Sequence, residues 1–198
     1  MRRVLLTMLL AAVAVVALPA QRGLRVSAAI ECAASLGDGL KSRRAFCDVL
    51  IATTPAASVL MSIPPHTGET TLQFDLHNRF TLPAVSVAGP LTFARHEAVV
   101  AVIRPAGAPI RRAAVAREFR TVADLFDQIG GGSRPGGAKA IAPGPPESIV
   151  VQLPAAVSAV GIVGVSLKVR TWATEETFDT PGRPVAMVSN VRVQYRPR

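Results

Sequence analysis

Short segments in which apolar and polar residues alternate constrain this chain more than any other feature of its sequence. The alternation is clearest in residues 71–77 and recurs in residues 165–172 and 190–196. Because successive side chains of a β-strand point to opposite faces, this period of two predicts strands with one buried and one solvent-facing side. The chain is therefore expected to be mainly β.

Weaker strand-like runs, each bounded by turn-forming residues, fill much of the remaining sequence. These runs cover residues 46–52, 58–63, 82–87, 91–95, 98–104, 111–119 and 148–153. Glycine and proline separate them, as in residues 64–68 and 105–107, where tight turns are favoured. About eight to nine short strands spaced in this way predict an antiparallel β-sandwich of the jelly-roll or immunoglobulin-like kind.

Two segments in the middle of the chain depart from the strand pattern. We expect one short helix near 121–129, because its apolar residues share one helical face and Gly130 ends it. The helical spacing extends back through residues 110–120, so that either a helix or a strand fits there, and we expect a strand. Residues 130–146 are rich in glycine and proline and are expected to form a mobile surface loop.

The first twenty residues have the order typical of a secretory signal peptide: a basic head, an uncharged apolar run, and small residues around a proline. The apolar run is short for a bilayer span, and an uncleaved anchor is the alternative. Cleavage is expected after Ala20, with Ala17 as the alternative site. We therefore expect a secreted or periplasmic protein with a signal peptide at 1–20, a single β-sandwich domain at 21–198 and no membrane span in the mature chain.

The chain has two cysteines, Cys32 and Cys47, and both lie in the expected mature protein. A disulfide is the usual state of such a pair in an oxidising compartment. In the chain-entropy model, closing a loop of this size stabilises the fold by about 3 kcal/mol. We therefore predict a bridge between the two residues.

Asp75 and His77 form the strongest candidate for chemistry. They lie two positions apart in a predicted strand, so their side chains are expected to share its solvent-facing side. An imidazole beside a carboxylate can bind a metal or act as an acid–base pair, whereas an ordinary polar strand face is the structural alternative. His66 and His96 join this pair only if the fold brings them there.

Other catalytic motifs are incomplete. A zinc-protease pattern begins at His96, but Val100 stands where the second histidine is required. The glycine-rich residues 131–139 lack a lysine at the phosphate-loop position. No metal site and no cofactor are therefore predicted, and the chain is expected not to be an enzyme.

Arginine dominates the positive charge, with 22 Lys and Arg against 13 Asp and Glu and a formal net charge of +9. The candidate ligand-binding residues are Arg111, Arg112, Arg117, Arg120 and Trp172. Guanidinium groups suit carboxylate, sulfate and phosphate, so an acidic polymer or an envelope protein is the expected partner. Nucleic acid is not expected, because aromatic residues that could stack on bases make up only 5% of the chain. In a strand these arginines point to both faces, which predicts an edge strand.

These observations favour an exported, non-catalytic β-sandwich with a binding or structural role in the cell envelope. A small metal-dependent or hydrolytic enzyme using Asp75 and His77 is one alternative. A carbohydrate- or acidic-polymer-binding domain using Trp172 and the arginines is the other. A concave pocket around Asp75 and His77 would favour the enzyme, whereas an exposed Trp172 with arginines nearby would favour the binding domain.

Overall fold

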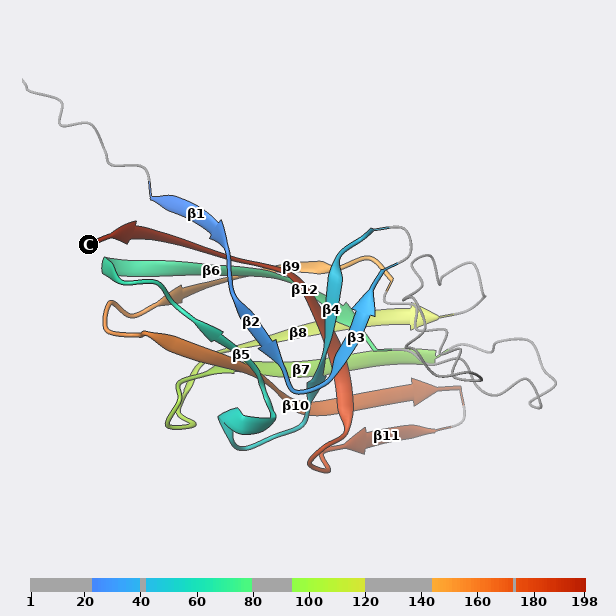
Figure 1. Ribbon diagram of the computed structural model, residues 1–198. Coiled ribbons are helices and arrows are strands. Elements are labelled where there is room, and N and C mark those ends of the chain that lie inside the picture. The colour runs from blue at the N-terminus through green and yellow to red at the C-terminus, as the bar shows by residue number, and fades with distance from the viewer. Residues whose placement is uncertain (1–22, 40–41, 80–93, 120–143, 173) are drawn as a thin grey trace, which may run out of the picture.

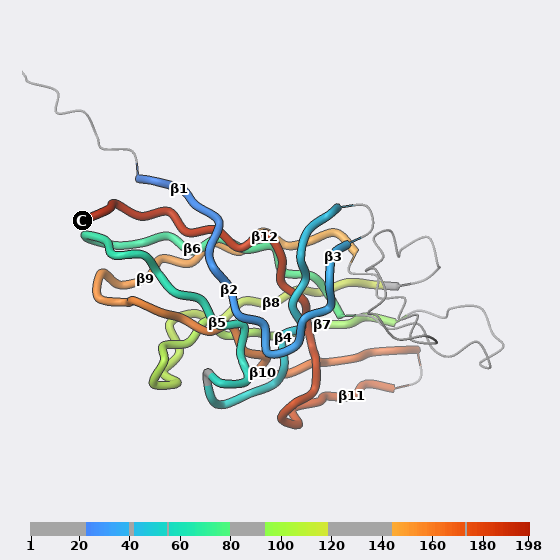
Figure 2. Tube along the Cα trace, in the orientation of Figure 1, coloured from blue at the N-terminus to red at the C-terminus, as the bar shows by residue number. Residues whose placement is uncertain are grey.

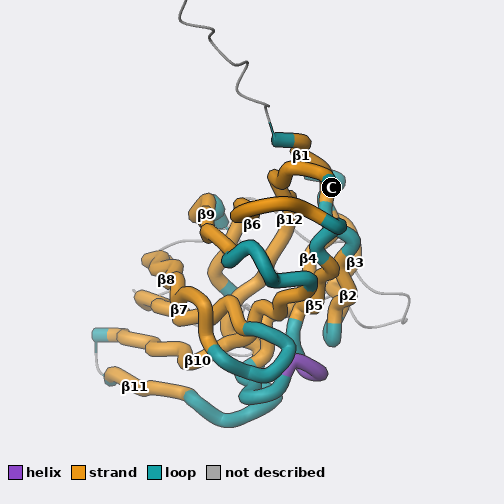
Figure 3. Tube along the Cα trace, turned by 90° about the vertical axis from the view of Figure 1, so that its left-hand side faces the viewer, coloured by secondary structure: helices purple, strands orange, loops and turns teal. Residues whose placement is uncertain are grey.

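The computed structural model describes residues 23–39, 42–79, 94–119, 144–172 and 174–198. In this part of the chain, twelve β-strands form two antiparallel sheets that pack face to face (Figures 1 and 3). The predicted β-sandwich is therefore confirmed. The predicted helix at 121–129 lies outside the described residues, as do the signal segment 1–20 and most of the loop 130–146.

Sheet A has the strand order β3–β4–β12–β6–β9, and β1 pairs with β12 beside β4. Its strands are β1 (Leu24–Ser27), β3 (Ser35–Asp38), β4 (Ala45–Leu50), β6 (His66–Asn78), β9 (Glu147–Leu153) and β12 (Pro184–Pro197). The long strand β12 has β6 along one side, while β4 and β1 share its other side (Figure 2).

Sheet B has the order β2–β5–β10–β7–β8, and β11 pairs with the part of β10 that β5 leaves open. Its strands are β2 (Ile30–Cys32), β5 (Val59–Ser62), β7 (Ala94–Ile103), β8 (Pro109–Phe119), β10 (Ala159–Thr171) and β11 (Glu175–Phe178). A single 3₁₀ turn, η1 (Pro55–Ala57), is the one helical element of the described residues. None of the helical segments described here has the length and apolar character needed to cross a membrane.

The strand number exceeds the prediction because several strands are too short to show an alternating pattern. Strands β1, β2, β3 and β11 have only three or four residues each. Strand β10 is longer than the predicted 165–172, because its first half is apolar on both faces. Val163 there packs with Ala101 and Ile103 in a small cluster on the outer side of sheet B. The predicted strand at 82–87 lies outside the described residues.

The core lies between the two sheets and contains the residues that the alternation marks as inward. Leu72, Phe74 and Leu76 of β6 are fully buried and belong to one cluster that both sheets share. The disulfide between Cys32 on β2 and Cys47 on β4 joins sheet B to sheet A, with the two Cα atoms 5.5 Å apart. The predicted bridge is thus confirmed, and it connects the two layers of the sandwich.

Strand β8 forms one edge of sheet B, which resolves the ambiguity of residues 110–119 in favour of a strand. Arg111 and Arg117 pair with Val102 and His96, whereas Arg112 pairs with Ala101 on the opposite face. Arginines therefore occur on both faces, as an edge strand permits, since side chains at the rim of a sandwich reach solvent. Arg120 lies outside the described residues.

Candidate functional site

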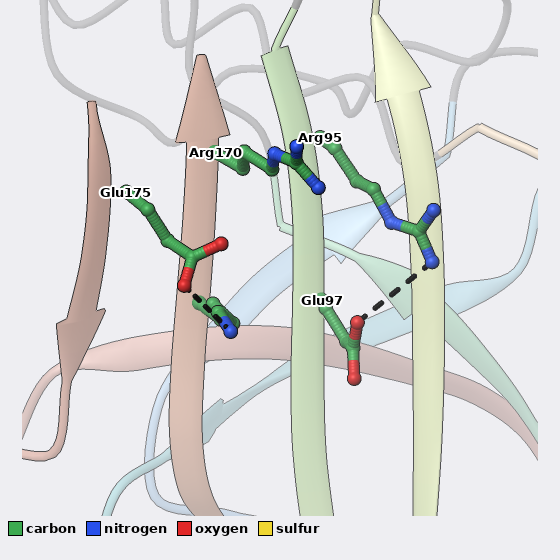
Figure 4. Close-up of a pocket in the computed structure, with 5 residues that line it drawn as sticks. Arg95, Glu97, Arg170 and Glu175 are labelled. Carbon is green, nitrogen blue, oxygen red and sulfur yellow. Dashed lines mark ion pairs between the residues drawn. The ribbon is translucent and has the colours of Figure 1, made fainter. Parts of the chain in front are cut away.

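Charged side chains cover the outer face of sheet B where β11, β10, β7 and β8 run side by side (Figure 4). We call this surface the charged face and define it by Arg95, Glu97, Glu118, Lys168, Arg170 and Glu175. These residues point outward because the alternate positions of the same strands, such as Leu167 and Ala98, belong to the core. The pattern that buries one side of the sheet therefore exposes a charged side.

The strand register arranges these charges in rows across the sheet. The first row runs from Glu175 through Arg170 and Arg95 to Glu118, each residue directly opposite the next. In the adjacent row Lys168 lies opposite Glu97. Arg170 and Arg95 are thus like charges in directly opposed positions, an arrangement that destabilises a sheet when nothing compensates it.

Three ion pairs neutralise part of the charged face. Lys168 Nζ lies 2.8 Å from Glu175 Oε1, and Arg95 lies 3.8 Å from Glu97 and 3.9 Å from Glu118. The hydrogen bond from Lys168, together with the positive charges of Lys168 and Arg170, lowers the pKa of Glu175 and keeps this carboxylate ionised. All of these side chains are about half exposed, so solvent screens each pair and the pairs contribute little to stability.

Arg170 differs from its neighbours because its guanidinium forms no hydrogen bond or ion pair with any residue that the structure describes. In Figure 4 its side chain extends across β7 toward Arg95. The two Arg95 ion pairs are longer than hydrogen bonds, so Arg95 also has donors that a ligand can use. The centre of the charged face therefore presents two guanidinium groups with unused donors.

Trp172 lies in the tight turn between β10 and β11, two positions past Arg170. The turn is closed by Thr171, whose N–H donates to the Thr174 carbonyl oxygen and whose Oγ1 accepts from the Thr174 N–H. Trp172 is 79% exposed. An indole normally buries most of its surface, so an exposed one at the end of a charged face is an available contact surface for a ligand.

Two shallow depressions hollow the charged face. One, of about 220 Å³, is lined by Arg95, Glu97, Lys168, Arg170 and Glu175, and is the site drawn in Figure 4. A second, of about 290 Å³, is lined by Arg95, Ala116, Arg117 and Glu118. Arg95 lines both depressions, one over β10 and β7 and the other at the edge formed by β8.

The predicted pair Asp75 and His77 lies on the outer face of sheet A, but the prediction that this side of β6 meets solvent is wrong there. Asp75 is 8% exposed and His77 is 3% exposed. The ring of Phe46, from β4 on the far side of β12, packs edge-on against His77 with the ring centres 5.0 Å apart. Asp75 accepts hydrogen bonds of 3.0 Å from both Arg44 and Asn190. Side chains from β4 and β12 therefore cover a face that the local pattern marks as polar.

His77 bonds to Ser189 of β12 and not to Asp75. Its Nε2 lies 2.9 Å from Ser189 Oγ, and its Nδ1 lies 3.3 Å from the Gly144 carbonyl oxygen. With Nδ1–H donating to the carbonyl, Nε2 accepts from the serine hydroxyl, which is the polarity of a nucleophile and its base. However, Ser189 is 0% exposed, so no substrate reaches its hydroxyl in this conformation. The local sequence gives no signal for this contact, because the two residues lie 112 positions apart.

The other candidate residues are separated from this pair. His66 lies at the far end of β6, where its Nδ1 is 2.8 Å from the Pro64 carbonyl oxygen, and His96 lies on sheet B. Among the residues that the structure describes, no three His, Cys, Asp or Glu side chains converge as a metal site would require. The fold thus does not gather the histidines into one site.

The arginines of β8 occupy two different settings. Arg117 donates to the Pro145 carbonyl oxygen and lies 3.1 Å from Glu147, so it ties β8 to the start of β9 in sheet A. Arg111 and Arg112 are exposed and lie toward the other end of β8, away from the charged face. Of the predicted arginines that the structure describes, only Arg117 lies next to the charged face.

Comparison with protein-family models, with curated proteins and with solved structures gives no match. Function therefore has to be inferred from the sites themselves.

Proposed function

We propose that this chain is an exported, non-catalytic binding module of the cell envelope, and that the charged face is its binding surface. The observation that carries this proposal is the guanidinium of Arg170, which projects from an open, hollowed face opposite Arg95. An anion between the two arginines would relieve their repulsion and would accept charge-assisted hydrogen bonds from both.

The partner that fits this face is an acidic polymer. The formal net charge of +9 attracts polyanions over long range, and the two depressions, which share Arg95, offer contacts from β10 to β8. Export is supported by the signal-like residues 1–20 and by a disulfide, which persists in oxidising compartments.

Retention on immobilised acidic polysaccharide, compared with neutral dextran, tests the proposal. Arg170→Ala should weaken retention about tenfold or more, since a hydrogen-bonded charge is worth about 1.5–3 kcal/mol. Arg112→Ala is the matched control, because it removes the same charge from an exposed site on another part of sheet B. Equal retention of the two variants would refute a role for the charged face.

A hydrolytic function is the second candidate, and the hydrogen bond between His77 and Ser189 is the observation that favours it. Burial of both groups argues against a hydrolytic function. Asp75 also argues against it, because its carboxylate bonds to Arg44 and Asn190. The imidazole of His77 is therefore oriented by a backbone carbonyl and not by a carboxylate. Such a network satisfies buried polar groups without any catalytic role.

A further inference from the structure

We infer that the ligand of the charged face is a hexuronic acid unit of a polysaccharide, with its carboxylate on Arg170 and Arg95 and its ring against Trp172. This inference rests on the proposed function and specifies the ligand chemistry of the same site. Three features of the charged face support it: the position of the unpaired guanidinium, the carboxylates that surround it, and the exposed indole.

The first feature selects an anion with a planar pair of oxygens. Arg170 and Arg95 are directly opposite on neighbouring strands, where Cβ atoms are about 5 Å apart. Guanidinium groups bind carboxylates through two parallel hydrogen bonds, one to each oxygen. One carboxylate can therefore contact Arg170 while it also receives a hydrogen bond from Arg95.

The second feature selects against a densely charged polymer. The charged face contains three cations, Arg95, Lys168 and Arg170, but also three carboxylates, Glu97, Glu118 and Glu175. A heavily sulfated chain would bring anions against these carboxylates, and like charges at close range repel. A polymer with one carboxylate per ring meets the arginines without placing charge on the glutamates.

One of these carboxylates can bind the uncharged part of a sugar. Glu97 is about half exposed and forms only a long ion pair with Arg95, so its oxygens have unused lone pairs. Sugar hydroxyl groups are donors that such oxygens accept. The face therefore offers donors for a carboxylate and acceptors for hydroxyls within one depression.

The third feature supplies an apolar contact of the right kind. Trp172 follows Arg170 by two positions, in the turn just past the end of β10. It therefore lies at the same end of the charged face as Arg170. The C–H faces of a pyranose ring are apolar, and an indole that is 79% exposed gives them a flat surface to cover.

Titration calorimetry with a short oligogalacturonate tests the inference on the folded, disulfide-bonded protein. We expect saturable binding that Arg170→Ala and Trp172→Ala each weaken about tenfold or more, while Arg112→Ala leaves it unchanged. Arg170→Lys should bind more tightly than Arg170→Ala but more weakly than the parent protein. An ammonium keeps the charge but cannot donate two parallel hydrogen bonds to a carboxylate. Unchanged thermal melts would show that these exposed substitutions leave the fold intact.

Three ligand controls isolate each part of the inference. The methyl ester of the same oligosaccharide keeps the rings but loses the charges, polyglutamate keeps carboxylates but lacks rings, and dextran sulfate carries sulfates on sugar rings. The inference predicts markedly weaker binding of all three.

The outcomes also separate this inference from the proposed function. Polyglutamate or dextran sulfate could be tested against the oligogalacturonate in the same titration. If either binds with equal affinity, and Trp172→Ala binds as the parent protein does, the uronic acid inference is overturned. The charged face would then remain an anion-binding surface. A second result would also overturn the inference: the oligogalacturonate does not bind, while retention on other acidic matrices still depends on Arg170. The proposed function would then stand. Binding that Arg170→Ala leaves unchanged would overturn both the inference and the proposed function.

Discussion

Arg170 and Arg95 occupy directly opposed positions on two antiparallel strands, and Arg170 has no hydrogen bond or ion pair among the described residues. The neighbouring charges are paired: Lys168 binds Glu175, and Arg95 approaches Glu97 and Glu118. Each arginine also has an acid directly opposite it on its other side, Glu118 for Arg95 and Glu175 for Arg170. The repulsion between the two arginines is what the proposed anionic ligand would relieve.

Replacement of Arg170 should separate stability from binding. Arg170→Thr removes a like-charge pair, breaks no hydrogen bond and introduces a residue that favours strands. The free energy of unfolding should therefore change by no more than about 0.5 kcal/mol, whereas retention on acidic polysaccharide should fall. Urea denaturation of both proteins measures the first quantity, and a loss well above 1 kcal/mol would show that Arg170 has a structural role.

The disulfide should stabilise the sandwich by linking its two sheets. Replacement of Cys32 and Cys47 together by alanine should lower the free energy of unfolding by about 3 kcal/mol. Alkylation of the unreduced protein should label neither cysteine. Efficient labelling of both residues in freshly exported protein would contradict the bridge.

Stability should fall as the pH is lowered from about 6.5 to about 4, because burial lowers the pKa of His96 from 6.5 to about 4. In this range the unfolded chain binds a proton that the folded protein does not, so protonation favours unfolding. The full effect is on the order of 3 kcal/mol and is reached below the folded pKa.

His96→Leu is the matched variant for this pH effect. It should remove that part of the decline while carboxylates continue to titrate, which equilibrium denaturation at several pH values can measure. An identical pH profile for the variant and the parent protein would contradict the assignment to His96.

Ser189 should be structural and not catalytic. A serine-directed fluorophosphonate should not label the folded protein, because the hydroxyl is fully buried. Ser189→Ala should instead lower the free energy of unfolding by about 1–3 kcal/mol, since it leaves a buried imidazole nitrogen of His77 without its partner. Stoichiometric labelling that disappears in Ser189→Ala would contradict this prediction and support a hydrolytic function.

Local pattern was sufficient to predict the sandwich but not the site. Alternation along β6 identifies Leu72, Phe74 and Leu76 as core residues, since strand geometry alone decides which side chains share a face. It does not reveal that Phe46 covers His77, because that contact depends on which strand lies beside which. Nor does it reveal that Arg170 lies opposite Arg95, because that position depends on a register set 75 residues away.

The most direct test of a binding role for the charged face is to map amide chemical shifts while the folded protein is titrated with oligogalacturonate. The largest changes should fall in β7, β10 and β11 around Arg95 and Arg170, and should be lost in Arg170→Ala. Changes centred on His77 and Ser189, or changes that persist unaltered in that variant, would contradict the assignment of binding to this face.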